Sequence, residues 1–229
     1  MKTVLIHGQN HKGSSYHIGR LLAESVSSAE EITEFFLPRD FDHFCVGCYT
    51  CLEDETKCPF WADKKPILDA MEQADLLIFT TPTYCYAPSA AMKSLLDVLF
   101  DCWIVHRPKA WMFRKKAVIL STSAGSGAKK AIRVIRDSVS YWGVSQIETL
   151  PVAVQATNWK QVPEKIKQKI HKRIAKLARK VQRPVKVSVR TRFLFWLFSK
   201  MHAGGMDASP AEKPYWQAQG WLSGKRPWK

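Results

Sequence analysis

Short apolar runs alternate with longer segments of helical spacing along the first 155 residues of the chain. Each short run is bounded by turn residues and is too brief for a helix, so it predicts a buried strand. The predicted strands are Thr3–His7, Ile32–Leu37, Leu76–Phe79, Ala117–Ser121 and Ser145–Val154. A strand that is apolar on both faces is typical of a parallel sheet covered by helices on its two sides.

Helical segments separate these strands, which makes the alternation regular. The helices are expected over Ser15–Ser27, around Ile67 to Met71, over Ser89–Leu99 and over Ala128–Tyr141. Five strands of this kind predict an α/β doubly wound parallel sheet of order 2-1-3-4-5, the flavodoxin-like arrangement. The order reverses between strands 1 and 3, and ligands of such sheets bind at the carboxyl ends of the strands.

The last third of the chain has a different pattern. Ile166, Ile170, Ile174, Leu177 and Val181 predict one amphipathic helix whose other faces are basic, and Pro184 ends it. An aromatic patch follows at Phe193–Phe198, and Pro214–Leu222 is expected to be irregular and anchored by aromatic side chains.

Net charge divides the chain at the same place. The formal charge is +15, and the segment from Lys160 onward supplies all of it, with 18 Lys and Arg against 3 Asp and Glu. The segment before it is neutral. We therefore expect a flavodoxin-like ligand-binding domain over residues 1–158 and a basic helical and aromatic extension over 159–229.

The 229 residues contain no apolar run long enough to span a bilayer. Met1–Gly8 enters a strand directly and lacks the features of a signal peptide. A cytoplasmic location is expected, in which the six cysteines would be thiols or metal ligands rather than disulfides.

The loop after the first strand has the composition of a phosphate site. It is rich in glycine and hydroxyl residues and runs into a helix N-terminus, where backbone N–H groups and the helix dipole favour an anion. Its candidate residues are Gln9, Asn10, His11, Gly13, Ser14, Ser15 and Tyr16. The alternative is that Ser14 or Ser15 merely caps the helix.

Two further loops follow strands 3 and 4 and would face the same crevice. The first is aromatic, with Pro82, Thr83, Tyr84, Cys85 and Tyr86, and the second is small, with Ser123, Ala124 and Gly125. A phosphate loop, an aromatic platform and a small-residue loop together indicate a planar cofactor with a phosphate tail.

The sequence over Met1 to Ala156 resembles the NAD(P)H-dependent FMN reductase and iron–sulfur flavoprotein group of flavodoxin-like oxidoreductases. The resemblance is carried by the strand-1 loop, by Cys45-x-x-Cys48-x-x-Cys51, and by Pro82-Thr-Tyr84 followed by Ser89-Ala-Ala-Met-Lys93. It implies FMN with its phosphate on Gln9 to Tyr16 and its ring between Pro82–Tyr86 and Ser123–Gly125. The usual Ser-Pro-Arg of the first loop is here Gln9-Asn10-His11.

A cluster of cysteines lies between strands 2 and 3. Cys45, Cys48, Cys51 and, six residues later, Cys58 followed by proline have the spacing of ligands to a [4Fe–4S] cluster. A structural zinc site is an alternative, although the chain lacks a paired Cys-x-x-Cys further on. The other interpretation, reduced thiols that bind no metal, is narrowly favoured.

If FMN is bound, the chemistry is that of the cofactor, and no catalytic side chain is expected. The resemblance implies NAD(P)H as reductant and a quinone, nitro compound, flavin or similar small molecule as electron acceptor. Tyr84 and Tyr86 are the candidates for positioning the ring. The alternative is an electron carrier with a [4Fe–4S] cluster and no direct use of NAD(P)H.

The basic extension has two interpretations. It would lie on an anionic membrane as a peripheral contact, or its aromatic patch would pack on a partner subunit and roof the flavin. The second is favoured, because homodimers and homotetramers are common for this fold. Specific nucleic-acid binding is not expected, since no nucleic-acid-binding motif accompanies the charge.

Overall fold

A computed structural model describes all residues, 1–229, and confirms the predicted fold class and strand order. Five parallel strands form one sheet of order β2-β1-β3-β4-β5. They are β1 Thr3–His7, β2 Ile32–Phe36, β3 Leu76–Pro82, β4 Lys116–Ser123 and β5 Gln146–Ala153. The register is continuous from Thr3 opposite Leu76 to Leu76 opposite Lys116 and Lys116 opposite Gln146, so the carboxyl ends of β1, β3 and β4 meet at one edge.

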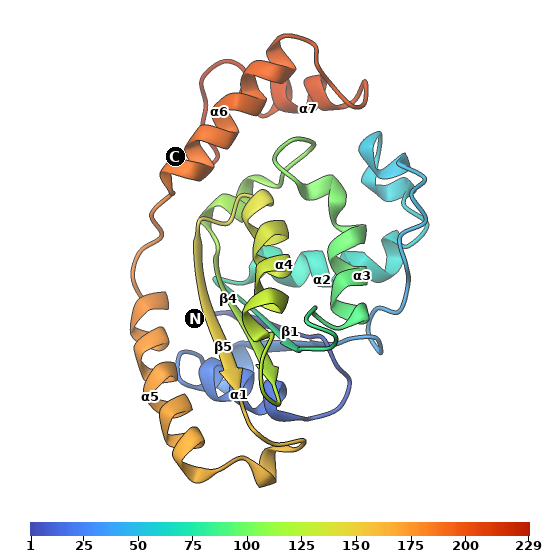
Figure 1. Cartoon of the computed structure of the whole chain (residues 1–229). Coiled ribbons are helices and arrows are strands. Elements are labelled where there is room, and N and C mark those ends of the chain that lie inside the picture. The colour runs from blue at the N-terminus through green and yellow to red at the C-terminus, as the bar shows by residue number, and fades with distance from the viewer.

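Seven α-helices accompany the sheet (Figure 1). They are α1 Ser14–Glu24, α2 Trp61–Gln73, α3 Ala90–Val98, α4 Ala128–Tyr141, α5 Glu164–Val181, α6 Val189–Ala203 and α7 Glu212–Ala218. Apolar residues of α2, α3 and α4 share a buried cluster with one face of the sheet. Those of α1 and α5 share a second cluster with the other face. The molecule is thus a three-layer α/β structure.

The central strands β1, β3 and β4 are buried because both faces of the sheet are covered, whereas the edge strands β2 and β5 are buried only in part. All five residues of β1 are buried. Successive side chains of a strand point to opposite faces. Val4 and Ile6 accordingly lie in the first cluster, and Leu5 lies in the second. This explains why the sequence shows continuous apolar runs rather than an alternating pattern.

Helix α5 is part of the sheet's covering layer. Its buried residues Ile170, Ile174, Leu177 and Val181 pack with Leu150 and Val152 of β5. The apolar stripe seen in the sequence therefore faces the sheet, and the basic residues face outward. The predicted division at residue 158 separates the sheet from this last covering helix, and it stays a prediction.

Helices α6 and α7 lie at the amino ends of the strands, opposite the edge where the loops of the predicted site emerge (Figure 1). The hydroxyl of Ser145, which precedes β5, donates to the hydroxyl of Thr191 over 2.9 Å. Phe195, Trp216 and Trp221 form a buried aromatic cluster with Ile104 and Phe113. Part of the patch thus packs within its own chain and does not roof the crevice of that chain.

The segment expected to be irregular near the C-terminus forms the short helix α7. Polar bonds hold it to the loop after α3. His106 Nδ1 and Glu212 Oε1 lie 2.7 Å apart, and the Trp216 indole N–H donates to the His106 carbonyl over 2.7 Å. Tyr215 donates to the Pro108 carbonyl over 2.6 Å. The end of the chain is therefore tied to the body of the protein.

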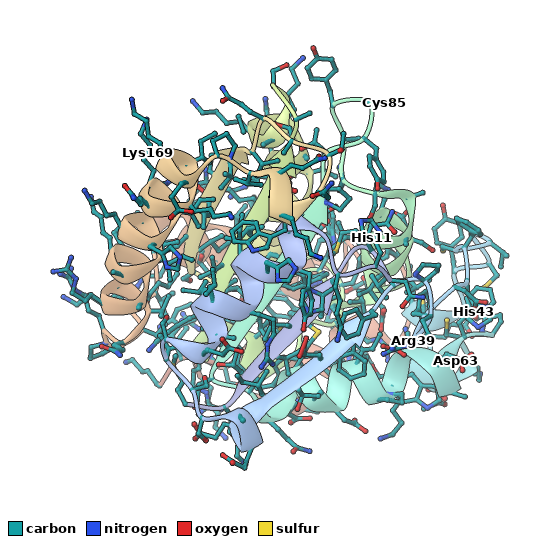
Figure 2. All side chains as sticks on the ribbon, turned by 90° about the horizontal axis from the view of Figure 1, so that it is seen from below. His11, Arg39, His43, Asp63, Cys85 and Lys169 are labelled. Carbon is teal, nitrogen blue, oxygen red and sulfur yellow. The ribbon has the colours of Figure 1, made fainter.

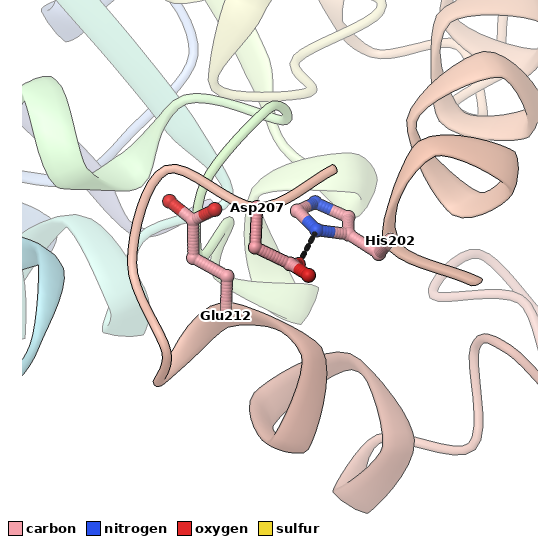
Figure 3. Close-up of side chains that lie close together, drawn as sticks. All are labelled: His202, Asp207 and Glu212. Atoms are coloured by element: carbon pink, nitrogen blue, oxygen red, sulfur yellow. Dashed lines mark hydrogen bonds and ion pairs between the residues drawn. The ribbon is translucent and has the colours of Figure 1, made fainter. Parts of the chain in front are cut away.

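A buried polar cluster lies where α6 turns into α7 (Figure 3). His202 Nδ1 and Asp207 Oδ1 lie 2.6 Å apart, and Glu212 accepts the backbone N–H of Ala208 over 2.8 Å. Burial favours a higher pKa for Glu212, but the hydrogen bonds from His106 and Ala208 outweigh it, so the pKa is lowered. The Glu212 carboxylate at the start of α7 thereby joins α7 to the turn at Ala208 and to the loop that carries His106.

Phe195 should carry much of the stability of the extension. Its side chain is fully buried between Trp216 and Trp221, with ring centroids at 5.1 and 5.4 Å. We expect Phe195→Ala to lower the free energy of unfolding by about 3–5 kcal/mol, the cost of truncating a buried aromatic ring. Urea unfolding of the whole chain measures it. Phe193→Ala on the exposed side of the same helix is the control and should cost less than about 1 kcal/mol; equal losses would contradict the packing.

Candidate functional site

The three predicted loops meet at the carboxyl edge of the sheet. The first loop leaves β1 beneath the start of α3. The Gly8 N–H donates to the Thr80 carbonyl over 2.7 Å. A Cβ atom at Gly8 would lie 2.7 Å from Ser89 Oγ and 3.0 Å from Thr81 Oγ1, so a side chain there would collide with the end of the neighbouring loop. Glycine therefore allows the first loop to pack directly against the segment that connects β3 to α3.

The N-terminus of α1 is open to a ligand. Gly13 is the N-cap residue, and no side chain caps the helix. The alternative in which Ser14 or Ser15 acts as the cap is therefore wrong, because both lie in the first turn. The N–H groups of a first turn have no partner within the helix, and they attract anions together with the helix dipole. Ser14 is half-buried beside them, whereas Ser15 is buried.

A tight turn presents the two tyrosines after β3. Tyr84 and Ala87 exchange two backbone hydrogen bonds of 3.0 and 2.9 Å. Between them, Cys85 and Tyr86 have φ values of 48° and 63°, the left-handed conformation of a two-residue hairpin turn. Such a conformation is unfavourable for residues other than glycine, by about 1 kcal/mol or more each. The turn nevertheless places Tyr84 and Tyr86 in exposed positions.

Contacts between the loops join them into one site at the position of the predicted crevice. Gln9 of the first loop donates to the Tyr84 hydroxyl over 3.2 Å. The hydroxyls of Tyr86 and Ser126 lie 3.4 Å apart, and Lys130 Nζ of α4 lies 4.7 Å from the centroid of the Tyr86 ring. Ser126 and Lys130 were not predicted from the sequence, although Ser126 belongs to the same small-residue loop.

The loop after β4 completes the crevice. Thr83 Oγ1 and Ser121 Oγ lie 2.8 Å apart, which joins the loop after β3 to the last part of β4. Gly127 has a φ of 97°, and a Cβ there would lie 2.8 Å from Tyr86 Cδ1. Both its conformation and its close approach to the tyrosine therefore require glycine.

Ser123 carries a buried hydroxyl with no hydrogen-bond partner. An unsatisfied buried polar group costs about 1–3 kcal/mol, and buried polar groups normally have partners. Its neighbours Ala124 and Gly125 are exposed, as are Asn10, His11 and Cys85. A ligand with a polar edge would satisfy the Ser123 hydroxyl, so the residues present fit a planar cofactor with a phosphate tail.

Below the first loop, His7 is held in a buried network. Its Nδ1 lies 2.9 Å from Thr80 Oγ1 and its Nε2 lies 3.0 Å from Glu34 Oε2. Burial favours a higher pKa for Glu34, but His7 and Arg20 outweigh it, and the pKa is lowered. Since both ring nitrogens have partners, His7 supports the loop from below, and it stacks on Phe36 at 4.6 Å between centroids.

The four predicted cysteine ligands line a separate groove. The groove has a volume of 630 Å³ and lies between the cysteine loop, the second half of α3 and the middle of α4. Its lining includes Cys45, Cys48, Cys51 and Cys58 together with Phe60, Phe100 and Trp103. None of its lining residues belongs to the three loops of the crevice. The structure therefore brings the cysteines together but not into the crevice.

The thiols of this groove differ in acidity. A hydrogen bond with Thr50 Oγ1, 3.2 Å from the sulfur, lowers the pKa of the exposed Cys48. Burial and the negative charge of Asp101 raise the pKa of Cys51 to about 11. The side chains of His202, Asp207 and Glu212 form the single group of three or more ligands whose donor atoms lie within 4.8 Å of one another. The cysteine sulfurs are thus not gathered as tetrahedral zinc requires, whereas a [4Fe–4S] cluster holds each thiolate on a separate iron.

A buried ion pair underlies the cysteine loop and was not predicted. Lys64 Nζ lies 3.2 Å from Asp101 Oδ1 and donates to the Val98 carbonyl over 3.2 Å. Arg107 donates to the Cys51 carbonyl, and Lys109 pairs with Glu55. Since His106 and Pro108 bind α7, the same loop connects the cysteine segment to the C-terminal extension.

An exposed His–Asp pair lies at the rim of the groove. His43 Nε2 and Asp63 Oδ2 are 2.8 Å apart, and the His43 ring stacks on Phe60 with 4.6 Å between centroids. Figure 2 shows this pair together and well apart from Cys85. Nothing in the sequence indicates that these two residues meet, because they lie 20 positions apart along the chain.

The sheet order and the crevice at the carboxyl ends of β1, β3 and β4 define a flavodoxin-like ligand-binding protein. The chain belongs to the NADPH-dependent FMN reductase family, whose model matches residues 1–158. The matched segment contains the whole sheet, all three loops of the crevice and the four cysteines of the groove.

Two curated relatives are similar over part of the chain. An iron–sulfur flavoprotein of Archaeoglobus fulgidus is 29% identical over 98 residues, which are 42% of this chain and 48% of the relative. An iron–sulfur flavoprotein of Methanocaldococcus jannaschii is 33% identical over 99 residues, which are 42% of this chain and 51% of the relative. The chain spans about half the length of the curated relatives it matches.

Solved structures support the fold. An azoreductase of Bacillus anthracis superposes with a TM-score of 0.58 at 15% identity, covering 79% of this chain and 100% of that one. An FMN-dependent NADH-azoreductase of the same species, determined with FMN, gives a TM-score of 0.58 at 11% identity and covers 78% and 100%. At these identities the likeness concerns the arrangement of the elements.

Cys48 and Cys51, whose pKa values are shifted in opposite directions, should differ in reactivity. With a pKa of about 11, Cys51 is ionised to only about one part in a thousand at pH 8, and the thiolate is the nucleophile. We expect iodoacetamide to modify Cys48 at least about tenfold faster than Cys51 in the reduced, metal-free protein. Peptide mass spectrometry over time measures both rates. Thr50→Val should slow the modification of Cys48 and leave the modification rate of the exposed Cys85 unchanged. Faster modification of Cys51 than of Cys48 would contradict the expected difference in acidity.

Proposed function

We propose that this protein is an FMN-dependent oxidoreductase that takes electrons from NAD(P)H and passes them to a small-molecule acceptor. The observation that carries the proposal is the buried, unpartnered Ser123 hydroxyl in a crevice bounded by an open helix N-terminus and two exposed tyrosines. Membership of the NADPH-dependent FMN reductase family supports it.

The proposed contacts follow from the three loops. The N-terminus of α1 and its loop would hold the phosphate, the tyrosine turn would contact one side of the ring, and the loop after β4 would contact the other. The proposed cofactor-binding residues are Gln9, Asn10, His11, Gly13, Ser14, Ser15, Tyr16, Pro82, Thr83, Tyr84, Cys85, Tyr86, Ser123, Ala124 and Gly125.

FMN, when bound, supplies the hydride and electron chemistry of the reaction. The chain's residues would bind and orient it: the first-turn N–H groups neutralise the phosphate, and Ser123 donates to or accepts from the ring edge. Gln9 and Lys130 hold Tyr84 and Tyr86 at the mouth of the crevice. A quinone, nitro compound, flavin or similar acceptor would enter where these two rings are exposed.

A second candidate function is an electron carrier that holds a [4Fe–4S] cluster and makes no direct use of NAD(P)H. The arrangement of Cys45, Cys48, Cys51 and Cys58 around one groove favours it, as do the names of the two curated relatives. The family that matches residues 1–158 is described by NADPH and FMN alone, so free thiols remain the preferred state of this loop.

We further propose a homodimer or homotetramer and a peripheral membrane contact through the extension. The exposed tyrosines leave one side of the crevice uncovered in a single chain, which supports a second copy near it. Helices α6 and α7 of the extension lie at the opposite edge of the sheet (Figure 1), so a membrane contact there would not obstruct a second copy near the crevice.

The absorption spectrum of anaerobically purified protein, before and after NADPH, tests the proposal. We expect two flavin bands that bleach on NADPH and iron and sulfide contents near zero. NADPH would reduce the bound FMN, and the reduced flavin would lack the absorption bands of the oxidised form.

Other spectra have other meanings. A broad brown absorbance beneath the flavin bands, bleached by dithionite and not by NADPH, with stoichiometric iron and sulfide, would establish the second function instead. A colourless protein that takes up no added FMN would overturn both proposals.

Ser123 is the residue whose truncation should weaken the binding of FMN without destabilising the fold. Ser123→Ala deletes an orphaned hydroxyl, so we expect unchanged or slightly raised stability of the apoprotein and about tenfold weaker FMN binding, the loss of one hydrogen bond. Fluorescence titration of FMN measures the affinity. Ser223→Ala, which removes an exposed serine hydroxyl of the C-terminal extension, is the matched control and should bind FMN within about twofold of the original protein. Equal affinities for the two variants would remove Ser123 from the site.

A further inference from the structure

An apolar stripe lies on the outer face of α6. Val189, Phe193, Trp196 and Leu197 are 84%, 56%, 51% and 37% exposed. They follow the spacing i, i+4, i+7 and i+8, which places them on one side of a helix. Phe195 and His202 on the opposite side are fully buried against the protein. The helix is thus apolar both toward the protein and away from it.

Exposed aromatic side chains in a contiguous row are unusual on a protein surface. Apolar residues scattered singly need no explanation, whereas a contiguous patch marks a contact with a partner or a membrane. The Phe193 and Trp196 rings lie 6.0 Å apart between centroids and share this row. Burying them would remove two large apolar rings from water.

The charge around the stripe is of one sign. From Lys165 to Met206 the chain has 13 Lys and Arg and no Asp or Glu. Arg192 and Lys200 are exposed on α6 itself, and Arg183 and Lys186 are exposed on the segment that leads into it. The lysines of this stretch meet two carboxylates, Glu148 at 2.7 Å from Lys180 and Glu164 at 4.0 Å from Lys167, and neither carboxylate lies on α6. The surface around the apolar stripe is therefore strongly positive.

From this combination we infer that the outer face of α6 docks on an anionic lipid bilayer, with Phe193 and Trp196 inserted at the headgroup boundary and Arg192 and Lys200 on the lipid phosphates. Apolar and aromatic residues on one side with Lys and Arg at the margins are what an interfacial helix requires. No helix of the protein has the length and apolar content to cross a bilayer, so the contact is peripheral.

Charge decides between a bilayer and a second copy of this chain. Joining two copies through this face would bring two arginine- and lysine-rich surfaces together, which costs free energy. An anionic bilayer complements the same charge. The docking face also lies at the amino edge of the sheet, so the crevice at the carboxyl edge would stay open to solvent and to its substrates (Figure 1). The inference does not depend on the proposed redox function.

The test is co-sedimentation of the full chain with vesicles of phosphatidylcholine, with and without phosphatidylglycerol. We expect binding to the anionic vesicles that weakens with added salt, and little binding to the neutral ones. Phe193→Ser combined with Trp196→Ser should weaken binding at least about tenfold, because the contact loses both inserted rings. Arg192→Gln combined with Lys200→Gln should weaken it less and reduce the salt dependence.

Matched controls keep the result interpretable. Phe44→Ser removes an aromatic ring that is exposed elsewhere, and Lys65→Gln removes an exposed lysine of the neutral part of the chain; both should bind vesicles like the original protein. Circular dichroism and FMN uptake report whether each variant is folded, independently of lipid.

Three results would overturn the inference. The first is no binding to anionic vesicles. The second is unchanged binding of the Phe193→Ser and Trp196→Ser protein. The third is a change in oligomeric state on the same substitution in the absence of lipid, seen by light scattering, because that would make the face a contact between copies. Loss of FMN binding with vesicle binding intact would instead concern only the proposed function.

Discussion

The burial of both faces of one parallel sheet is the constraint on which the rest of the structure depends. Each strand must be apolar on both sides, and each connection must cross the sheet as a helix. All the strands therefore end at the same edge, and their loops meet there whatever their sequences. The crevice formed by the loops after β1, β3 and β4 is a consequence of this geometry, and the side chains of the loops adapt it to a ligand.

Most of the fold could be predicted because its signal is local. Continuous apolar runs marked the buried strands β1, β3 and β4, shorter apolar segments marked the edge strands β2 and β5, and the stripe from Ile166 to Val181 marked α5. The sequence did not indicate which other element each apolar surface packs against. The stripe of α5 faces β5 and completes one layer, although the jump in charge at Lys160 suggested a boundary before it. A change in surface charge reports on what faces solvent and says little about where a core ends.

The candidate site was predictable to the level of loops and not of contacts. Glycine and serine after β1 and tyrosines after β3 identified the three segments. The packing of Gly127 against Tyr86 and the unpartnered hydroxyl of Ser123 depend on residues distant in sequence. The left-handed backbone of Cys85 and Tyr86 is local, but it occurs without the glycine or asparagine that usually marks such a turn. The pairs Lys64–Asp101 and His43–Asp63 join positions 37 and 20 residues apart, and no spacing rule connects them.

The C-terminal extension shows how a terminal segment can be both part of the core and a surface of its own. Phe195, Trp216 and Trp221 fix α6 and α7 at the amino edge of the sheet, and the bonds of α7 to His106 and Pro108 fix the loop that supports Cys51. The cysteine loop thus depends on both halves of the chain. Because α6 is anchored by one face, its outer aromatic residues are held in a rigid row, and a rigid row loses less conformational entropy on docking than a flexible tail would.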